Sequence, residues 1–268
     1  MKKFNRLIFN LITYIFVFLL SFPLVNLIIW MFAKRWEWPY LFPNEFSLRG
    51  LKYFIGSSDS VQLLLYSIWL SLVVTIVTVI ISIPASKALG VYNFKGKKIF
   101  EFFIISPLLV PTVSVAMGIH IVFIKLGIAN TFLGVVLVHL IPCIPYGVRI
   151  LTDVFAIVGE SMEIQARVLG ASSIKAFFYV TLPMIMPGIL SAASMVFIVS
   201  FSQYFLTFLI GGGRVITFAM AMFPFIESGD RMMASLYSIV FILTSLLFLV
   251  LIERLVKSYY KLENNYFV

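Results

Sequence analysis

The sequence predicts an all-α membrane protein with six transmembrane helices. Hydrophobic residues make up 62% of its 268 residues and charged residues only 12%, whereas a soluble domain carries roughly 25% charged residues. Such a chain has too few polar side chains to cover a soluble fold, so much of its surface must face lipid. The apolar residues also occur in long charge-free stretches that follow one another along the chain, which leaves no room for a separate soluble domain.

Each of the six stretches is long enough to cross a bilayer, because a hydrocarbon core about 30 Å thick takes about 20 helical residues. The first stretch follows basic residues, as the core of a signal peptide does, but it exceeds the usual length of about 7–15 residues, so we expect an uncleaved span. The fifth is too long for one helix, so Pro183 and Pro187 indicate where the helix begins, and the glycines at 211–213 indicate where it ends. The six stretches are residues 7–33, 60–86, 102–124, 126–148, 176–213 and 232–252.

The basic residues predict the orientation of these spans. Of the 20 lysines and arginines, thirteen fall on the side of the N-terminus and seven on the opposite side, and an excess of basic residues marks the cytoplasmic side. We therefore expect both termini in the cytoplasm. This topology accounts for most of the net charge of +9, so no nucleic acid is expected as a partner. Residues 215–226 are apolar but too short to cross, and they are expected to form an interfacial or re-entrant helix on the outer side.

The sequence lacks the motifs of an enzyme. Its nearest approach to a phosphate-binding loop is at residues 90–98, where the spacing is one residue too long and Lys98 stands where serine or threonine would bind magnesium. We therefore expect no ATP hydrolysis by this chain. No metal-ligand spacing surrounds Cys143, and no catalytic pair lies within a span. His120 and His139 both fall within predicted spans, and a structural role in helix packing is favoured for both.

The longest cytoplasmic loop lies between the fourth and fifth spans. Residues 161–169 predict a short amphipathic helix, with Ser161 as its cap and Glu163 in its first turn, where the helix dipole favours an acid. Gly170 is placed to end this helix in a left-handed conformation. A second helical piece, capped by a serine, is expected over residues 172–180. A helix held in this way across the membrane surface can fit into a groove of a cytoplasmic partner.

The spacing of this loop resembles the EAA loop of the permease subunits of ABC importers, in which EAA is followed by three residues, a glycine, nine residues and then I-x-L-P. The matching residues are Ile164-Gln165-Ala166, Gly170 and Val180-Thr181-Leu182-Pro183. The resemblance implies the fold of a type I ABC importer permease. In the family this loop forms a coupling helix that docks into a cleft of the ATPase subunit. The residues expected to couple to the ATPase are Glu163, Ile164, Ala166, Arg167, Gly170, Ala171, Ser172, Leu182 and Pro183.

The chain departs from the family pattern at the acidic residue. Ile164 stands at the glutamate position of the family, and Glu163 lies one residue earlier, which turns its side chain about 100° around the helix. The sequence leaves open whether Glu163 takes over the usual acidic contact. The domains expected from the resemblance are residues 1–59, with the first transmembrane helix and an outer loop, and residues 60–268, the permease core with its coupling loop at 160–183.

Downstream of the loop, the sequence looks most like permeases of the polyamine, phosphonate and iron class, through residues 200–204, 206–207 and 211–213. This likeness implies a small polar solute as substrate, such as a polyamine, a phosphonate, iron or a vitamin-like compound. Polyamine permeases often carry an acidic residue near Ser202 and Gln203, and this chain has none there. Polar groups within a span must face other helices or a cavity, so we expect a substrate pathway here. Its residues are Ser200, Ser202, Gln203, Tyr204 and Thr207.

The resemblance also implies the partners of the chain. An ATP-binding cassette ATPase dimer would hold ATP and magnesium, so no cofactor is expected in this chain itself. A second permease subunit, related or identical, would enclose the pathway in the bacterial cytoplasmic membrane, and an extracytoplasmic solute-binding protein would deliver the substrate. An ion-coupled secondary transporter and an intramembrane enzyme are the alternatives from other classes, but the spans lack the carboxylates that either would use.

Overall fold

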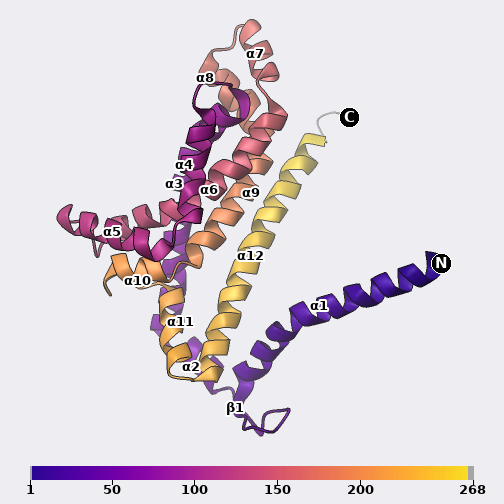
Figure 1. Cartoon of the computed structure of the whole chain (residues 1–268), viewed down its shortest axis with the longest axis vertical. Helices are drawn as coiled ribbons and strands as arrows, with labels where there is room; N and C mark the ends of the chain where they lie inside the picture. The colour runs from indigo at the N-terminus through magenta and orange to yellow at the C-terminus, as the bar shows by residue number, and fades with distance from the viewer. Residues whose placement is uncertain (1, 265–268) are drawn as a thin grey trace. The chain divides into compact units, whose positions relative to one another are not determined.

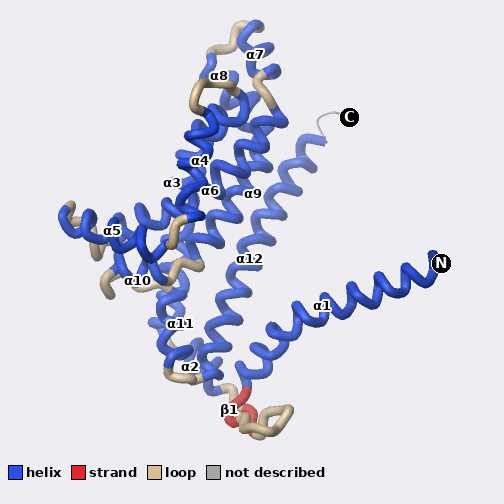
Figure 2. The backbone as a smooth tube through the Cα atoms, in the orientation of Figure 1, coloured by secondary structure: helices blue, strands red, loops and turns tan. Residues whose placement is uncertain are grey.

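The computed structural model describes residues 2–264, and it describes side chains for residues 9, 10 and 12–255. Helices make up most of this part of the chain, and the strands β1 and β2 form an antiparallel hairpin (Figure 1, Figure 2). The elements are α1 (Lys2–Phe32), β1 (Ala33–Arg35), β2 (Glu45–Phe46), α2 (Arg49–Gly56), α3 (Ser58–Val91), α4 (Lys97–Leu109), α5 (Thr112–Lys125), α6 (Phe132–Val158), α7 (Ser161–Val168), α8 (Ser173–Ala176), the π-helical turn η1 (Phe177–Thr181), α9 (Leu182–Phe201), α10 (Phe205–Gly211), α11 (Phe218–Glu227) and α12 (Arg231–Asn264).

The chain forms two compact units, which are described separately. Unit 1 holds the residues up to 62 together with 221–244, and unit 2 holds 63–220 together with the residues from 245 onwards. The long helices α3 and α12 therefore each contribute residues to both units.

Five of the described helical segments are long and apolar enough to span a membrane. The bent pair α4 and α5 makes a sixth span if the two helices are counted together. The expected six spans thus correspond to five unbroken segments and one broken one. The unbroken segments are Ile12–Phe32, Ser58–Val91, Phe132–Val158, Ser173–Phe201 and Arg231–Leu255.

The third expected span, residues 102–124, is not one straight helix. The structure breaks it between α4 and α5, whose axes differ in direction by 100°. Pro111 explains the break, because proline disfavours a helical conformation for the residue before it and has no N–H to donate. Val110 is accordingly extended, with φ of −89° and ψ of 135°. The charge-free pattern alone did not reveal this bend.

The fourth and fifth spans also differ from their expected limits. α6 begins at Phe132 rather than near residue 126, because Thr131 caps it by accepting a hydrogen bond from the Gly134 N–H at 3.1 Å. The fifth span ends at Phe201, well before the glycines at 211–213. Those glycines instead end the separate short helix α10. α11 is a ten-residue apolar helix within the segment expected to be too short to cross.

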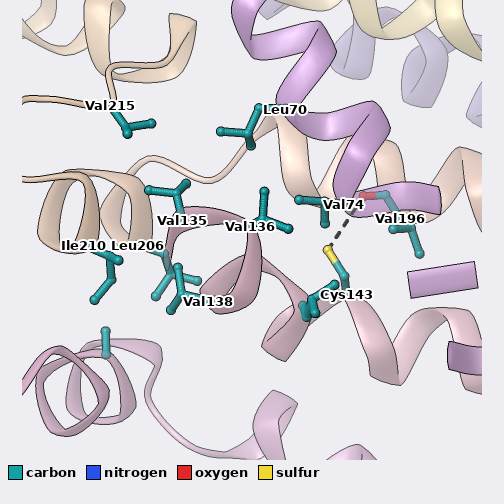
Figure 3. Packing of buried hydrophobic residues seen from close by; sticks show 12 residues of the cluster. Leu70, Val74, Val135, Val136, Val138, Cys143, Val196, Leu206, Ile210 and Val215 are labelled. Carbon is teal, nitrogen blue, oxygen red and sulfur yellow. Dashed lines mark hydrogen bonds between the residues drawn. The ribbon is translucent and has the colours of Figure 1, made fainter. Parts of the chain in front are cut away.

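The main core of unit 2 surrounds α6. Figure 3 shows Val135, Val136 and Val138 of this helix packed among buried apolar side chains of α3, α9 and α10. Nearer the other end of α6, Leu151 and Phe155 pack against α9. Small residues allow the close approach: a Cβ atom on Gly188 of α9 would lie 2.6 Å from a Val154 methyl carbon.

Unit 1 consists of α1, the hairpin, α2, the start of α3 and the residues of 221–244. The hydroxyls of Ser60 and Tyr237 lie 2.8 Å apart and are buried, which joins the start of α3 to α12. Gly50 of α2 faces the Met232 side chain. The ring of Trp30, near the end of α1, is stacked on the ring of Trp36, which follows β1, with centroids 4.6 Å apart. The membrane-spanning face of α1 is exposed, as expected for a helix in contact with lipid or another chain.

Candidate functional site

The candidate site is the loop that connects α6 to α9 in unit 2. Figure 1 shows its helices α7 and α8 beyond the ends of α3, α6 and α9. Two glycines with positive φ shape the loop, Gly159 at 66° before α7 and Gly170 at 98° after it, and glycine adopts this backbone conformation without a steric penalty. The helix predicted over residues 161–169 is present as α7, which ends at Val168, and Gly170 follows it with positive φ as predicted. Ser161 is the first helical residue rather than the cap, which is Glu160.

The second half of the loop begins at Ser172, as predicted. The Ser172 hydroxyl caps α8 by accepting a hydrogen bond from the Lys175 N–H at 3.3 Å. The helix then widens into the π turn η1, an uncommon conformation that is often found at functional sites. Leu182 starts α9, which continues directly from η1, and Pro183 is its second residue.

The two faces of α7 differ in burial. Glu163 and Ala166, three residues apart, are its partly buried residues, while the rest of the helix is exposed. The exposed residues include an apolar group in which Val168 and Leu169 have 81% and 88% of their surface accessible. Exposed apolar side chains next to each other are typical of a surface that contacts a partner. The exposed apolar group is Met162, Ile164, Val168 and Leu169.

Glu163 points away from this exposed group and into the protein. Its carboxylate accepts hydrogen bonds from the Lys87 ammonium at 2.7 and 2.8 Å and from the Thr181 hydroxyl at 2.6 Å. The Glu163 side chain is only 12% exposed and that of Lys87 only 19%. Lys87 also lies 5.7 Å from the centre of the Phe177 ring, within the range of a cation–π contact. One ion pair therefore joins α7 to α3 and to η1.

These contacts determine the charge state of Glu163. Burial by itself would raise the pKa of its carboxyl group. The hydrogen bonds from Lys87 and Thr181, and the positive charges of Lys87 and Arg167, outweigh burial and hold the pKa below its ordinary value of 4.5. Glu163 is therefore ionised at neutral pH, and its carboxylate binds Lys87 and Thr181 of the same chain.

The other predicted coupling residues lie along the same loop. Ile164 and Arg167 are exposed on α7, and Ala166 faces inward. The Ala171 N–H donates to the Ala166 carbonyl at 3.0 Å, which closes the turn around Gly170. The structure thus places all of the predicted coupling residues in one continuous segment, with Glu163 and Ala166 on its inner side.

The predicted pathway residues lie at the break between α9 and α10. Ser202 is exposed, and Gln203 and Tyr204 are partly buried between the two helices. Ser200 and Thr207 are buried, and each contacts His139 of α6. The imidazole Nδ1 lies 3.0 Å from the Ser200 hydroxyl, and Nε2 lies 2.8 Å from the Thr207 hydroxyl.

Two residues that matter to these regions were missed or undervalued by the sequence reasoning. Lys87 is one of the thirteen basic residues on the side of the N-terminus, and nothing in its local sequence links it to Glu163, which is 76 positions away. His139 was assigned a structural role, and its contacts on both sides of the α9–α10 break agree with that role. Within the described residues, no cluster of three or more histidine, cysteine or acidic side chains is arranged to hold a metal ion.

Known proteins of similar sequence include permease proteins of transport systems. The putrescine transport system permease protein PotI of Escherichia coli is 29% identical over 143 residues, which is 51% of each chain. The molybdate/tungstate transport system permease protein WtpB of Pyrococcus furiosus is 33% identical over 129 residues, 48% of this chain and 51% of that protein. The aligned region therefore spans about half the length of these relatives.

The fold also matches that of a solved transporter. The crystal structure of a bacterial ABC transporter that imports the acidic polysaccharide alginate has a chain that matches with a TM-score of 0.71, at 13% sequence identity and 96% coverage of both chains. The chain thus has the fold of an ABC importer permease. Residues 82–261, two thirds of the sequence and the whole of the loop described above, match the family of the binding-protein-dependent transport system inner membrane component, and the protein belongs to that family.

Proposed function

We propose that this protein is the permease subunit of an ATP-driven importer and that α7 is its coupling helix. The observation that carries the proposal is the division of α7 into two faces. Its inner face is bonded to the spanning helix α3 through Glu163, and its outer face exposes Val168 and Leu169. Burying each of these side chains in a partner would contribute about 1.5–3 kcal/mol. A helix that binds on one side and is anchored on the other can transmit force.

The proposed partners follow from the same family membership. The chain lacks a phosphate-binding loop, so an ATPase dimer on the cytoplasmic side holds ATP and magnesium. A second permease subunit completes the pathway, and a solute-binding protein delivers the substrate from the outside. The excess of basic residues on the side of the N-terminus supports an orientation with both termini in the cytoplasm.

The proposed substrate is a small polar solute. Named relatives carry putrescine, which is a cation, and molybdate or tungstate, which are anions, so the family as such does not select a charge. The break between α9 and α10 supports passage of a polar solute here, because Gln203 and Tyr204 bring polar groups to a point where the span is interrupted. Acidic side chains are absent from residues 200–207, which favours recognition by neutral hydrogen-bonding groups.

Co-purification with the ATPase tests the proposal. The chain is co-expressed with its neighbouring ATPase, permease and solute-binding genes and purified through a tag on this chain. We expect the ATPase to co-purify with the native chain and to be lost with Leu169→Asp, since a charge in a buried apolar contact is unfavourable. Leu41→Asp is the matched control, because Leu41 is 85% exposed and lies in the expected outer loop. Failure of the native chain to retain any ATPase would refute the proposal.

A further inference from the structure

We propose that Lys87 is a positioning residue that holds the coupling helix against the spanning helices, and that Glu163 serves this internal contact rather than the contact with the ATPase. The inference rests on the proposed function of α7 and extends it to a residue of α3. When the ion pair between Lys87 and Glu163 is broken, the transporter should still hydrolyse ATP but should transport less substrate for each ATP.

The first argument is that the contacts form a closed junction of three elements. Lys87 of α3 bonds Glu163 of α7 at 2.7 Å, and Glu163 accepts a hydrogen bond from Thr181 of η1 at 2.6 Å. Lys87 faces the ring of Phe177, also in η1. Each element is therefore linked to the other two. Displacement of any one of them strains a contact with both of the others.

The second argument is that apolar packing fixes α7 only weakly to the rest of unit 2. None of its residues is fully buried, so apolar packing, the usual source of helix stability in proteins, contributes little here. The exposed apolar group of α7 faces away from the protein. The polar junction is consequently the main side-chain anchor by which α7 is fixed to a membrane-spanning helix.

The third argument concerns the cost of separating the charges. With 12% and 19% of their side chains exposed, Glu163 and Lys87 are largely withdrawn from water. Separating such a pair without exposing both groups leaves an uncompensated charge, which is strongly unfavourable. The junction therefore favours motion of α3, α7 and η1 together over motion of α7 alone. Lys87 is also adjacent to Ser86, whose hydroxyl donates to the Val148 carbonyl of α6 at 2.9 Å, so the anchor continues into the core of unit 2.

The fourth argument is the register of the loop. Glu163 and Ile164 are consecutive residues of α7, and one position rotates a side chain by about 100°. This rotation places Ile164 on the exposed side and Glu163 on the buried side, as the structure shows. The same register therefore gives α7 an exposed apolar face, which includes Ile164, and an inward-facing ionic contact through Glu163.

The experiment compares transport per ATP in the complete transporter reconstituted in lipid. The variants are Lys87→Met, Glu163→Gln, Thr181→Val and the charge exchange Lys87→Glu with Glu163→Lys. Lys95→Met is the control, because Lys95 is exposed and lies on a neighbouring cytoplasmic turn. We expect the ATPase to remain bound and active in each variant. Transport per ATP should fall roughly tenfold in Lys87→Met, since a buried partner is left unpaired, less in Thr181→Val, and recover in part in the charge exchange.

A distance measurement on the full chain alone separates this inference from the proposed function. Spin labels are placed at Leu169→Cys on the loop and Tyr92→Cys after α3, and Cys143 is fully buried and does not compete for label. We expect one narrow distance distribution in the native chain, a broad one in Lys87→Met, and a narrow one again in the charge exchange. An equally narrow distribution in Lys87→Met, or unchanged transport per ATP, would overturn the role of Lys87. Loss of ATPase binding by the native chain would instead count against the proposed function.

Discussion

Lys87 and Glu163 are 76 positions apart in the chain, and their side chains meet at 2.7 Å near the C-terminal end of α3. This pair connects the helix expected to contact the ATPase with a helix that crosses the membrane. Ile164 occupies the glutamate position of the loop pattern, so neither Lys87 nor Glu163 belongs to that pattern. The contact became visible only when the fold brought α3 and α7 together.

The ion pair predicts how the loop responds to acid. The pKa of Glu163 in the folded protein is below 4.5, so its stabilising contribution is fully present above that value and is lost only as the pH falls through the lowered pKa. The distance between labels at positions 92 and 169 should therefore stay constant from about pH 8 to about pH 5. In Glu163→Gln the distribution should be broad across the whole range. Broadening of the native distribution near neutral pH would contradict the lowered pKa.

We expect the backbone conformation at the end of α7 to require glycine at position 170. A Cβ atom at this position would touch nothing within 4 Å, but φ is 98°, and a left-handed conformation costs an alanine about 1–2 kcal/mol. Gly170→Ala should lower the melting temperature and broaden the label distances of the loop. Gly118→Ala is the control: its Cβ also meets nothing, and Gly118 lies within a regular helix, where alanine is favoured by about 0.5–1 kcal/mol. Equal effects of the two substitutions would show that the backbone conformation of Gly170 is unimportant.

We expect His139 to stabilise the break between α9 and α10. Replacing it with leucine removes the contacts to the Ser200 and Thr207 hydroxyls. The Thr207 hydroxyl keeps its hydrogen bond to the Gln203 carbonyl, but the buried Ser200 hydroxyl loses its His139 partner, and an unpaired buried hydroxyl costs about 1–3 kcal/mol. We expect a lower melting temperature in detergent and a change in transport rate, because the residues around Gln203 lose a fixed position. His120→Leu is the control, since His120 is partly exposed. If both substitutions lower stability equally, the bridge made by His139 is not the cause.

Close packing between α6 and α9 requires a glycine at position 188. A Cβ atom there would approach a Val154 methyl carbon to 2.6 Å, so Gly188→Ala should destabilise the protein by about 1–3 kcal/mol through overpacking. Removing the obstacle with Val154→Ala should restore much of the loss in the double variant. Thermal unfolding of the four proteins measures this coupling, and simple additivity of the two single effects would contradict the predicted contact.

The sequence was sufficient for the helical class, for the approximate position of each span and for the loop, because apolar stretches and helix-ending glycines act locally. It did not reveal the bend at Pro111, since a charge-free stretch looks continuous whether or not its helix is broken. It also did not reveal that Ser200 and Thr207, two of the expected pathway residues, contact His139. Which side a polar residue faces depends on a neighbouring helix that is distant in sequence. The same reason explains why Lys87 was not connected with Glu163.

The π turn η1 has a consequence for how the span that follows it is oriented. A π turn holds one more residue than an α-helical turn would, so it behaves as a single insertion ahead of α9. If the same five residues of Phe177–Thr181 formed an ordinary α-helix, every later side chain of α9 would be rotated by about 100°. Ser200 would then turn away from His139, and a different set of side chains would meet the interior of the bundle. By absorbing one extra residue, the π turn thus selects which surface of a twenty-residue helix becomes its inner one.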